Sequence, residues 1–258
     1  MQQSFVYDAN DKRSVNTLIG KVYGYMFFAL LVTAIISFGT GILFSIWLFG
    51  TANPADALYG DVELTLNSVN GAMALLIMLV ISAISLLVLS FVVHIRAARG
   101  KSITVPAGIY VVMMGLLLSE LVLFVPWPIL GITFVITAGV FGIMFLISYI
   151  SKGSLNFLGV LGLGLFIGAG IISLVGWILL LTGALGDYMT LYWIVSLLTF
   201  AAIMFITIWD MWRIKKIAEG GEMSDNLVLY CAFILYVDFI YLFMRILRIV
   251  LYFVSRRN

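Results

Sequence analysis

Two aspartates lie inside otherwise apolar segments near the end of the chain. Asp210 stands in FITIWDMWRIKK and Asp238 in ILYVDFIYLFMRILR. A carboxylate at membrane depth costs about 3 kcal/mol or more, so it is rarely found there without a partner or a function. Two carboxylates that meet at one depth can share a proton or bind a cation. These two residues are therefore the first candidates for chemistry.

The spacing of the two aspartates predicts that they lie close together. A short polar stretch, residues 219–226, separates their apolar segments. If this stretch is the turn of a helical hairpin, its centre lies about 12 residues after Asp210 and about 16 residues before Asp238. A helix rises by about 1.5 Å per residue, so the two carboxylates would differ in depth by only about 5 Å. The hairpin would thus place both acids at one level.

The composition indicates an integral membrane protein. Of the 258 residues, 64% are hydrophobic and 10% charged, and the mean hydropathy is +1.19. Soluble domains carry about 25% charged residues. The net charge of +2 and the lack of a long basic run argue against a nucleic-acid partner. The chain has one cysteine and one histidine, and that histidine, His94, lies near a membrane edge. It therefore offers neither a cluster of His and Cys metal ligands nor a Ser-His-Asp triad, and we expect no enzyme and no cofactor.

Seven apolar runs are long enough to cross a bilayer, which takes about 20 residues in a helix. Between the third and fourth runs stands Pro126-Trp127-Pro128, which predicts a tight turn. In the fifth run, Gly164 and Gly168 have the GxxxG spacing that favours close helix packing. The sequence thus predicts an all-α fold with one membrane domain, residues 21–258, after a cytoplasmic segment, residues 1–20. The predicted spans are 22–49, 69–93, 104–125, 129–150, 157–181, 191–214 and 227–254.

The charges of the loops predict the orientation of the spans. Lysine and arginine collect in cytoplasmic loops. They occur here before the first span and after the second, fourth and sixth: Lys12, Arg13, Lys21, Arg96, Arg99, Lys101, Lys152, Arg213, Lys215 and Lys216. The alternate loops carry only acids: Asp56, Asp61, Glu63 and Asp187. We therefore expect a cytoplasmic N-terminus.

The last run does not fit that scheme fully, because its basic residues fall toward the opposite end. These residues are Arg245, Arg248, Arg256 and Arg257. A re-entrant last helix would return them to the cytoplasm. The apolar length of the run favours a full span, and charge counting leaves both alternatives open.

Two further charged residues are candidates for a role in ion passage. Arg96 closes the second span on the predicted cytoplasmic side. It is either a snorkelling anchor or a gate whose guanidinium bonds Asp210 or Asp238 and closes the cytoplasmic mouth. Glu120 lies about two-thirds along the third span. It either lines a pore or is a buried acid satisfied by nearby hydroxyl groups.

At these residues the chain resembles the Bax-inhibitor-motif (TMBIM) family, including its bacterial calcium-leak members. The last helix of that family follows the pattern ALxLYLDFINLFxxLLR, and this chain has CAFILYVDFIYLFMRILR at 231–248. The family's preceding helix ends in an aspartate and an Ile-Lys run, as in DMWRIKKI from Asp210. KVYGYMFFALLVTA at 21–34 is similar to the family's first span, and Glu120 falls where many members carry an acid. In place of the family's asparagine after DFI stands Tyr241.

The resemblance implies a fold and an activity. The expected fold has seven helices, with the last one central and six wrapped around it. The expected activity is a pH-sensitive passive calcium leak in which Asp210 and Asp238 share a proton and gate the flux, with these two residues as tentative Ca²⁺ ligands. For the gating arginine the resemblance points to the basic cluster 94–101, in which Arg96 is the choice. The partners expected are the lipid bilayer and Ca²⁺, and protein partners stay unknown.

Two other classes of function compete with the leak. Intramembrane aspartyl proteases also use two aspartates on neighbouring helices, but they resemble Gly-x-Gly-Asp at the second one, where this chain has Tyr236-Val237-Asp238. They also carry a later Pro-Ala-Leu element, and no proline follows Asp238. A non-conducting regulator of cell survival or of other channels is the main alternative. The short N-terminal segment favours a bacterial inner-membrane protein.

Overall fold

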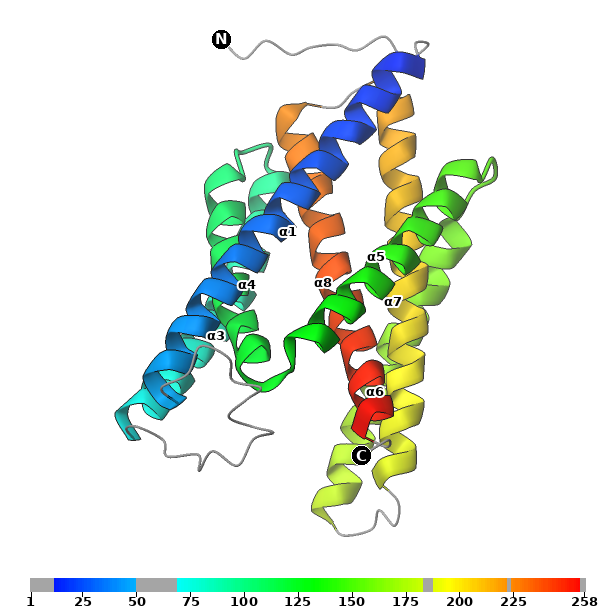
Figure 1. Ribbon diagram of the computed structural model, residues 1–258. Helices are drawn as coiled ribbons and strands as arrows, with labels where there is room; N and C mark the ends of the chain where they lie inside the picture. Colours follow the sequence, from blue (N-terminus) through cyan, green and yellow to red (C-terminus); the bar gives the residue numbers. More distant parts are fainter. Residues whose placement is uncertain (1–11, 50–68, 183–187, 222–223, 256–258) are drawn as a thin grey trace. The chain divides into compact units, whose positions relative to one another are not determined.

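The computed structural model describes residues 12–49, 69–182, 188–221 and 224–255, and this part of the chain is helical without strands (Figure 1). It contains seven long helices, which confirms the predicted all-α class. Their bounds are α1 Lys12–Phe49, α3 Val69–Ala98, α4 Thr104–Phe124, α5 Trp127–Ile150, α6 Asn156–Leu181, α7 Tyr188–Glu219 and α8 Asp225–Ser255. The acids of the predicted outer loops, Asp56, Asp61, Glu63 and Asp187, lie outside the described residues, as do Arg256 and Arg257.

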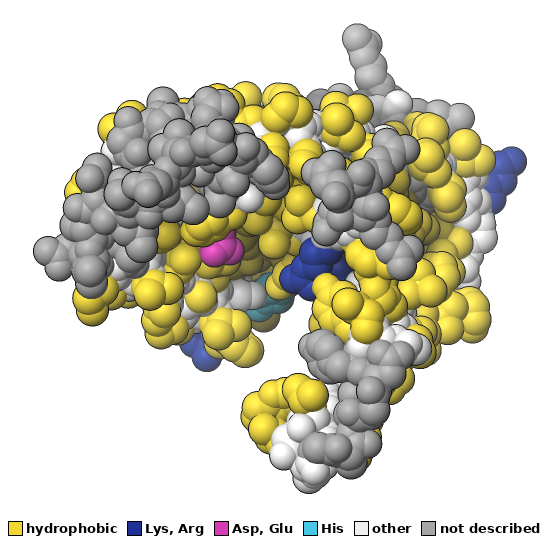
Figure 2. Space-filling model, turned by 60° about the horizontal axis from the view of Figure 1, so that its bottom comes forward, with side chains coloured by type: hydrophobic (Ala, Val, Ile, Leu, Met, Phe, Trp, Pro, Cys, Tyr) yellow, Lys and Arg dark blue, Asp and Glu magenta, His cyan; other side chains and the backbone are white. Residues whose placement is uncertain are grey.

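Each of the seven helices is long and apolar enough to cross a membrane. The mean hydropathy of their spans ranges from 2.1 to 3.0. A helix satisfies all its backbone hydrogen bonds internally, which hydrocarbon requires because it offers no water. Most of the described side chains visible in the space-filling view are hydrophobic, as a lipid-facing surface needs (Figure 2). The chain is a multi-pass membrane protein.

The helix ends extend beyond the predicted apolar runs. α1 begins at Lys12, so the predicted boundary at residue 20 falls within a helix. Hydropathy locates the apolar part of a helix, whereas the backbone hydrogen bonds continue into polar residues outside it. α8 is one unbroken helix of 31 residues, which fits a full span better than a re-entrant segment. The assignment of residues 21–258 to a single domain stays a prediction.

A tight turn separates α4 from α5, as the prolines predicted. Val125, which follows α4 and precedes Pro126, has an extended backbone with φ −118° and ψ 129°. A residue before proline is held in this region by the clash with the proline ring. The Val125 amide still donates to the Leu121 carbonyl at 2.9 Å, so α4 ends with its last hydrogen bond made.

The chain forms two compact units. Unit 1 comprises Met1–Ile132 with Gly221–Tyr236, and unit 2 comprises Thr133–Gly220 with Val237–Asn258. The long helix α8 therefore contributes its first part to unit 1 and its second part to unit 2. The predicted central position of this helix among the other six stays a prediction.

In unit 1, close packing joins α1 to α4 through small residues. A Cβ built on Gly115 of α4 would lie 2.8 Å from Ile36, and one built on Gly41 of α1 would lie 2.7 Å from Val122. Glycine is thus needed at both crossings, as is common where membrane helices approach each other. α8 joins this pair by a hydrogen bond of 2.7 Å between the hydroxyl groups of Tyr236 and Thr33.

In unit 2, glycines of α6 receive side chains of α7. A Cβ on Gly159 would lie 2.7 Å from the Trp209 ring, and one on Gly162 would lie 2.8 Å from Ile206. The prediction for Gly164 and Gly168 was wrong, because a Cβ at either position would meet no described atom within 4 Å. In a helix that contains many glycines, two of them can have the GxxxG spacing by chance, without a helix packed against them.

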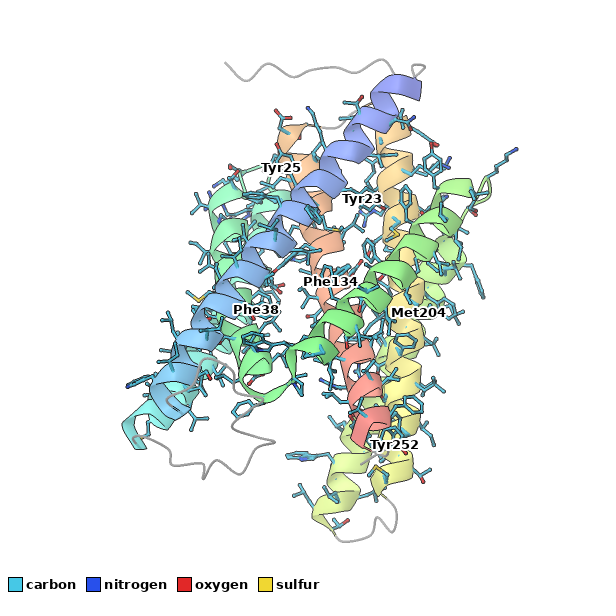
Figure 3. All side chains as sticks on the ribbon, in the orientation of Figure 1. Tyr23, Tyr25, Phe38, Phe134, Met204 and Tyr252 are labelled. Carbon is cyan, nitrogen blue, oxygen red and sulfur yellow. The ribbon has the colours of Figure 1, made fainter. Side chains whose placement is uncertain are left out.

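Aromatic rings join α5 to the second part of α8 in unit 2. The Phe239 ring lies 5.5 Å from that of Phe134 and 5.4 Å from that of Phe141. At the far end of α8, the rings of Tyr252 and Trp193 of α7 lie 4.2 Å apart. Figure 3 labels Phe134 and Tyr252 on these helices. These contacts hold α8 directly after Asp238 and again near its C-terminal end.

Candidate functional site

Asp210 lies on α7 directly after Trp209, in the part of this helix that packs against α6. Ile206 and Trp209 meet the glycines of α6, and the indole nitrogen of Trp209 donates to the Asn156 side chain at 3.3 Å. Asp210 is buried, with 8% of its surface exposed. The close packing of α6 on α7 therefore positions the helix segment that carries this carboxylate.

Asp238 lies on α8 in the same unit, one residue before the Phe239 ring that packs against α5. Its Oδ2 atom is buried and accepts no hydrogen bond from the part of the chain that the structure describes. A buried carboxylate oxygen without a donor is expensive when it carries charge. This oxygen therefore fits a proton or a cation as its partner.

The structure brings the two aspartates together. Their carboxyl groups lie close enough to act on each other electrostatically. Two carboxylates that are close together in a low dielectric do not both ionise freely, so they titrate as a pair. That Asp210 and Asp238 share one proton stays a prediction.

Arg213 is a further charged neighbour of Asp210, although the charges of the loops indicated only its use in predicting the orientation of the chain. It lies three residues after Asp210 on α7 and acts on that carboxylate electrostatically. Its guanidinium lies 5.4 Å from the centre of the Trp209 ring, within the range of a cation–π contact. Residues three apart are neighbours on a helix surface, so the spacing was the signal that could have indicated it.

The other two candidates lie in unit 1. Arg96 is exposed near the end of α3, and its Nε donates to the Ser102 carbonyl at 3.0 Å. Glu120 is partly buried on α4, next to the buried Ser119, whose hydroxyl donates to the Leu116 carbonyl at 2.6 Å. The gating role of Arg96 and the pore-lining role of Glu120 stay predictions.

Two carboxylates alone do not complete a calcium site. Within the described ranges, no group of three or more His, Cys, Asp or Glu residues could hold a metal ion. Calcium takes about 6 to 8 oxygen ligands, whereas two carboxylates supply at most about four. The tentative role of Asp210 and Asp238 as Ca²⁺ ligands stays a prediction.

Comparisons with known proteins show the family of the chain. Residues 15–256 match the family described as inhibitor of apoptosis-promoting Bax1. The chain is 28% identical over 243 residues to the Escherichia coli inner membrane protein YbhL, and this alignment covers 92% of each chain. It is 32% identical over 143 residues to the Rickettsia prowazekii protein RP147, which covers 54% of this chain and 58% of the other. No solved structure gives a significant match. The chain therefore belongs to the Bax inhibitor family of membrane proteins, as its resemblance predicted.

Proposed function

We propose that this protein is a pH-sensitive passive calcium leak, gated by a proton that Asp210 and Asp238 share. The observation that carries the proposal is the position of the pair. Two acids on two membrane-spanning helices lie close enough to interact, and one of their oxygens is buried without a hydrogen-bond donor. Membrane proteins rarely contain such a pair unless it serves ion or proton passage.

The sign of the pH dependence follows from the charge of the pair. At low pH the two carboxyl groups keep a proton, and the pair carries at most one negative charge. As the pH rises the proton leaves, and two negative charges then repel each other and attract a cation. In the proposed mechanism Arg96 is that cation, and its guanidinium closes the cytoplasmic mouth. The Ca²⁺ flux therefore falls as the pH rises.

Several further properties belong to the same proposal. Glu120 lines the path of the ion in unit 1, and no chemical step or resident cofactor is involved. The N-terminus is cytoplasmic, in line with the basic loops. The protein resides in a bacterial inner membrane, as its relative YbhL does by name. The partners are the bilayer, Ca²⁺ and protons.

Replacing either acid tests the proposal. In proteoliposomes, wild-type Ca²⁺ flux should fall as the pH rises. We expect Asp210→Asn and Asp238→Asn to remove this dependence, because an amide neither binds nor releases a proton in this range. Arg96→Gln should keep the flux high at high pH, since the proposed gate then lacks its cation. The measurement is flux from an entrapped Ca²⁺ indicator at a series of pH values.

Asp225→Asn is the matched control. Asp225 is an exposed acid in the first turn of the same helix as Asp238, so the substitution removes a carboxylate without touching the pair. It should leave the pH dependence as in the wild type. An unchanged profile in both pair variants would overturn the sensor. If folded wild-type protein carries no Ca²⁺ at any pH, the leak itself is wrong and the non-conducting regulator takes its place.

A further inference from the structure

Unit 1 contains an apolar groove between α1, α4 and the first part of α8. Its volume is about 300 Å³, the lower end of the range of about 300–1,000 Å³ that is typical of ligand pockets. The floor consists of buried side chains from α4 and α8: Ala107, Val111, Ala232, Phe233 and Tyr236. All the lining residues belong to unit 1, whereas Asp210 and Asp238 belong to unit 2. Neither acid of the proposed proton-sharing pair lines the groove.

The rim of the groove is open. Tyr25 and Phe28 on α1 expose 50% and 64% of their surface, and Tyr25 is labelled on this helix in Figure 3. On the α4 side the rim is formed by Gly108, where an added Cβ would meet nothing within 4 Å. These residues lie inside membrane-spanning helices. What fills an open groove at this depth is hydrocarbon, because lipid is the solvent there.

The buried hydroxyl group at the floor of the groove is already paired. The Tyr236 hydroxyl pairs with the Thr33 hydroxyl at 2.7 Å, and Thr33 belongs to the α1–α4 contact. The Tyr110 ring stands edge-on to both Phe233 and Tyr236, which keeps the floor rigid. The groove thus presents aromatic and aliphatic surface and calls for a flexible apolar chain.

Charged residues mark one end of the groove. Lys21 lies on the same face of α1 as Tyr25 and Phe28, four and seven residues earlier. Lys101 lies three residues before Thr104, a lining residue, and its carbonyl accepts a hydrogen bond of 3.0 Å from Asn226 of α8. Among the described residues of unit 1, Asp225, at the start of α8, is the acid at this end. Two lysines against one aspartate leave the described part of this end positive.

We propose that this groove binds one acyl chain of an anionic phospholipid, whose phosphate lies between Lys21 and Lys101. The apolar floor takes the hydrocarbon, and the lysines take the headgroup, as in basic sites between membrane helices that bind anionic lipids. The bound chain contacts three helices of unit 1 and bridges them. A zwitterionic lipid fits the hydrocarbon part but gains less from the lysines.

Photo-crosslinking of lipid probes tests the site. The full-length protein is reconstituted with phosphatidylglycerol that carries a diazirine in one acyl chain, and crosslinked peptides are mapped by mass spectrometry. Crosslinks should concentrate in residues 25–32, 104–111 and 229–236. Gly108→Trp should reduce them at least several-fold, because the indole fills the groove from a position where a side chain meets no obstacle. Gly139→Trp is the matched control, since Gly139 is also helical, exposed and open but lies outside the groove.

A second arm tests the headgroup. In competition with a phosphatidylcholine probe of the same chain, the phosphatidylglycerol probe should be preferred, and Lys21→Gln with Lys101→Gln should remove the preference. Lys152→Gln with Lys216→Gln, which removes two exposed lysines of unit 2, should not. Crosslinks spread evenly over all exposed helix faces, or unaffected by Gly108→Trp in protein that unfolds like the wild type, would overturn the site. Equal labelling by both probes in the wild type would overturn its anionic specificity.

Discussion

The helices α6 and α8 have nearly the same apolar character but bury very different amounts of surface. The mean hydropathies of their spans are 2.4 and 2.2, whereas 11% of the α6 window and 50% of the α8 window are buried inside the protein. Lipid is as apolar as a leucine side chain, so hydrophobicity gives no reason for a helix to leave it. The contrast teaches that burial in this protein follows from shape and polar groups.

The residues that each helix buries show both causes. The buried residues of α6 are small and recur every seven positions: Gly162, Ala169 and Gly176. α6 thus presents one narrow stripe, which meets α7 at Gly162 and Gly176. α8 buries bulky side chains and two polar groups, the Tyr236 hydroxyl and the Oδ2 atom of Asp238, which lipid cannot satisfy. α6 therefore contacts α7 along one narrow stripe, whereas α8 buries bulky side chains against neighbouring helices.

The largest expected effect comes from truncating a leucine on each helix. Leu242 of α8 is 0% exposed, and Leu163 of α6 is 56% exposed. Leu242→Ala should lower the free energy of unfolding by about 2–5 kcal/mol, because it leaves a cavity among packed neighbours. Leu163→Ala should change it by at most about 0.5 kcal/mol, because lipid or detergent replaces the lost methyl groups. SDS titration in micelles measures both. Equal losses would break the contrast.

A smaller effect separates two glycines of α6 itself. Gly162→Leu forces a side chain against Ile206 and the α7 backbone, whose Ala202 carbonyl would lie 3.1 Å from the new Cβ. Overpacking of this kind costs about 1–3 kcal/mol. Gly164→Leu adds the same atoms where nothing lies within 4 Å, so it should be neutral or slightly stabilising. The same titration compares them. A loss at Gly164 as large as that at Gly162 would mean that the GxxxG face also packs.

These glycines also show how far the sequence alone could go. Apolar runs predicted all seven helices, because length and hydropathy are properties of one segment. The choice between Gly162 and Gly164 is not such a property, since it depends on where the bulky side chains of another helix fall. The sequence pattern favoured Gly164, and the packing of Ile206 selected Gly162.

The aspartates were easier to find than their surroundings. A charge inside an apolar run is visible in one segment, and chain order placed Asp210 and Asp238 at one depth. The proximity of Arg213 to Asp210 and the orphaned oxygen of Asp238 needed coordinates, because both depend on side-chain directions. The partners of Tyr236 were equally hidden, since Thr33 lies 203 residues away in the chain.

The bond between Tyr236 and Thr33 carries the smallest predicted effect, and it tests whether polar groups help to hold α8. Thr33→Val keeps the shape of the side chain but removes the hydroxyl that pairs with Tyr236. Hydrogen bonds between membrane helices contribute about 0.6 kcal/mol on average and at most about 1.7 kcal/mol. We expect a loss in this range, measured by the same unfolding titration.

Thr40→Val is the matched control on the same helix, because the Thr40 hydroxyl donates at 2.6 Å to the Ile36 carbonyl of α1 itself. It should therefore cost less than Thr33→Val. In a double-mutant cycle, Tyr236→Phe should be nearly neutral once Thr33 is valine, since the bond is already gone. Additive losses would show that the two hydroxyls act separately. In that case shape alone would hold this part of α8, and the contrast with α6 would reduce to the size of the buried side chains.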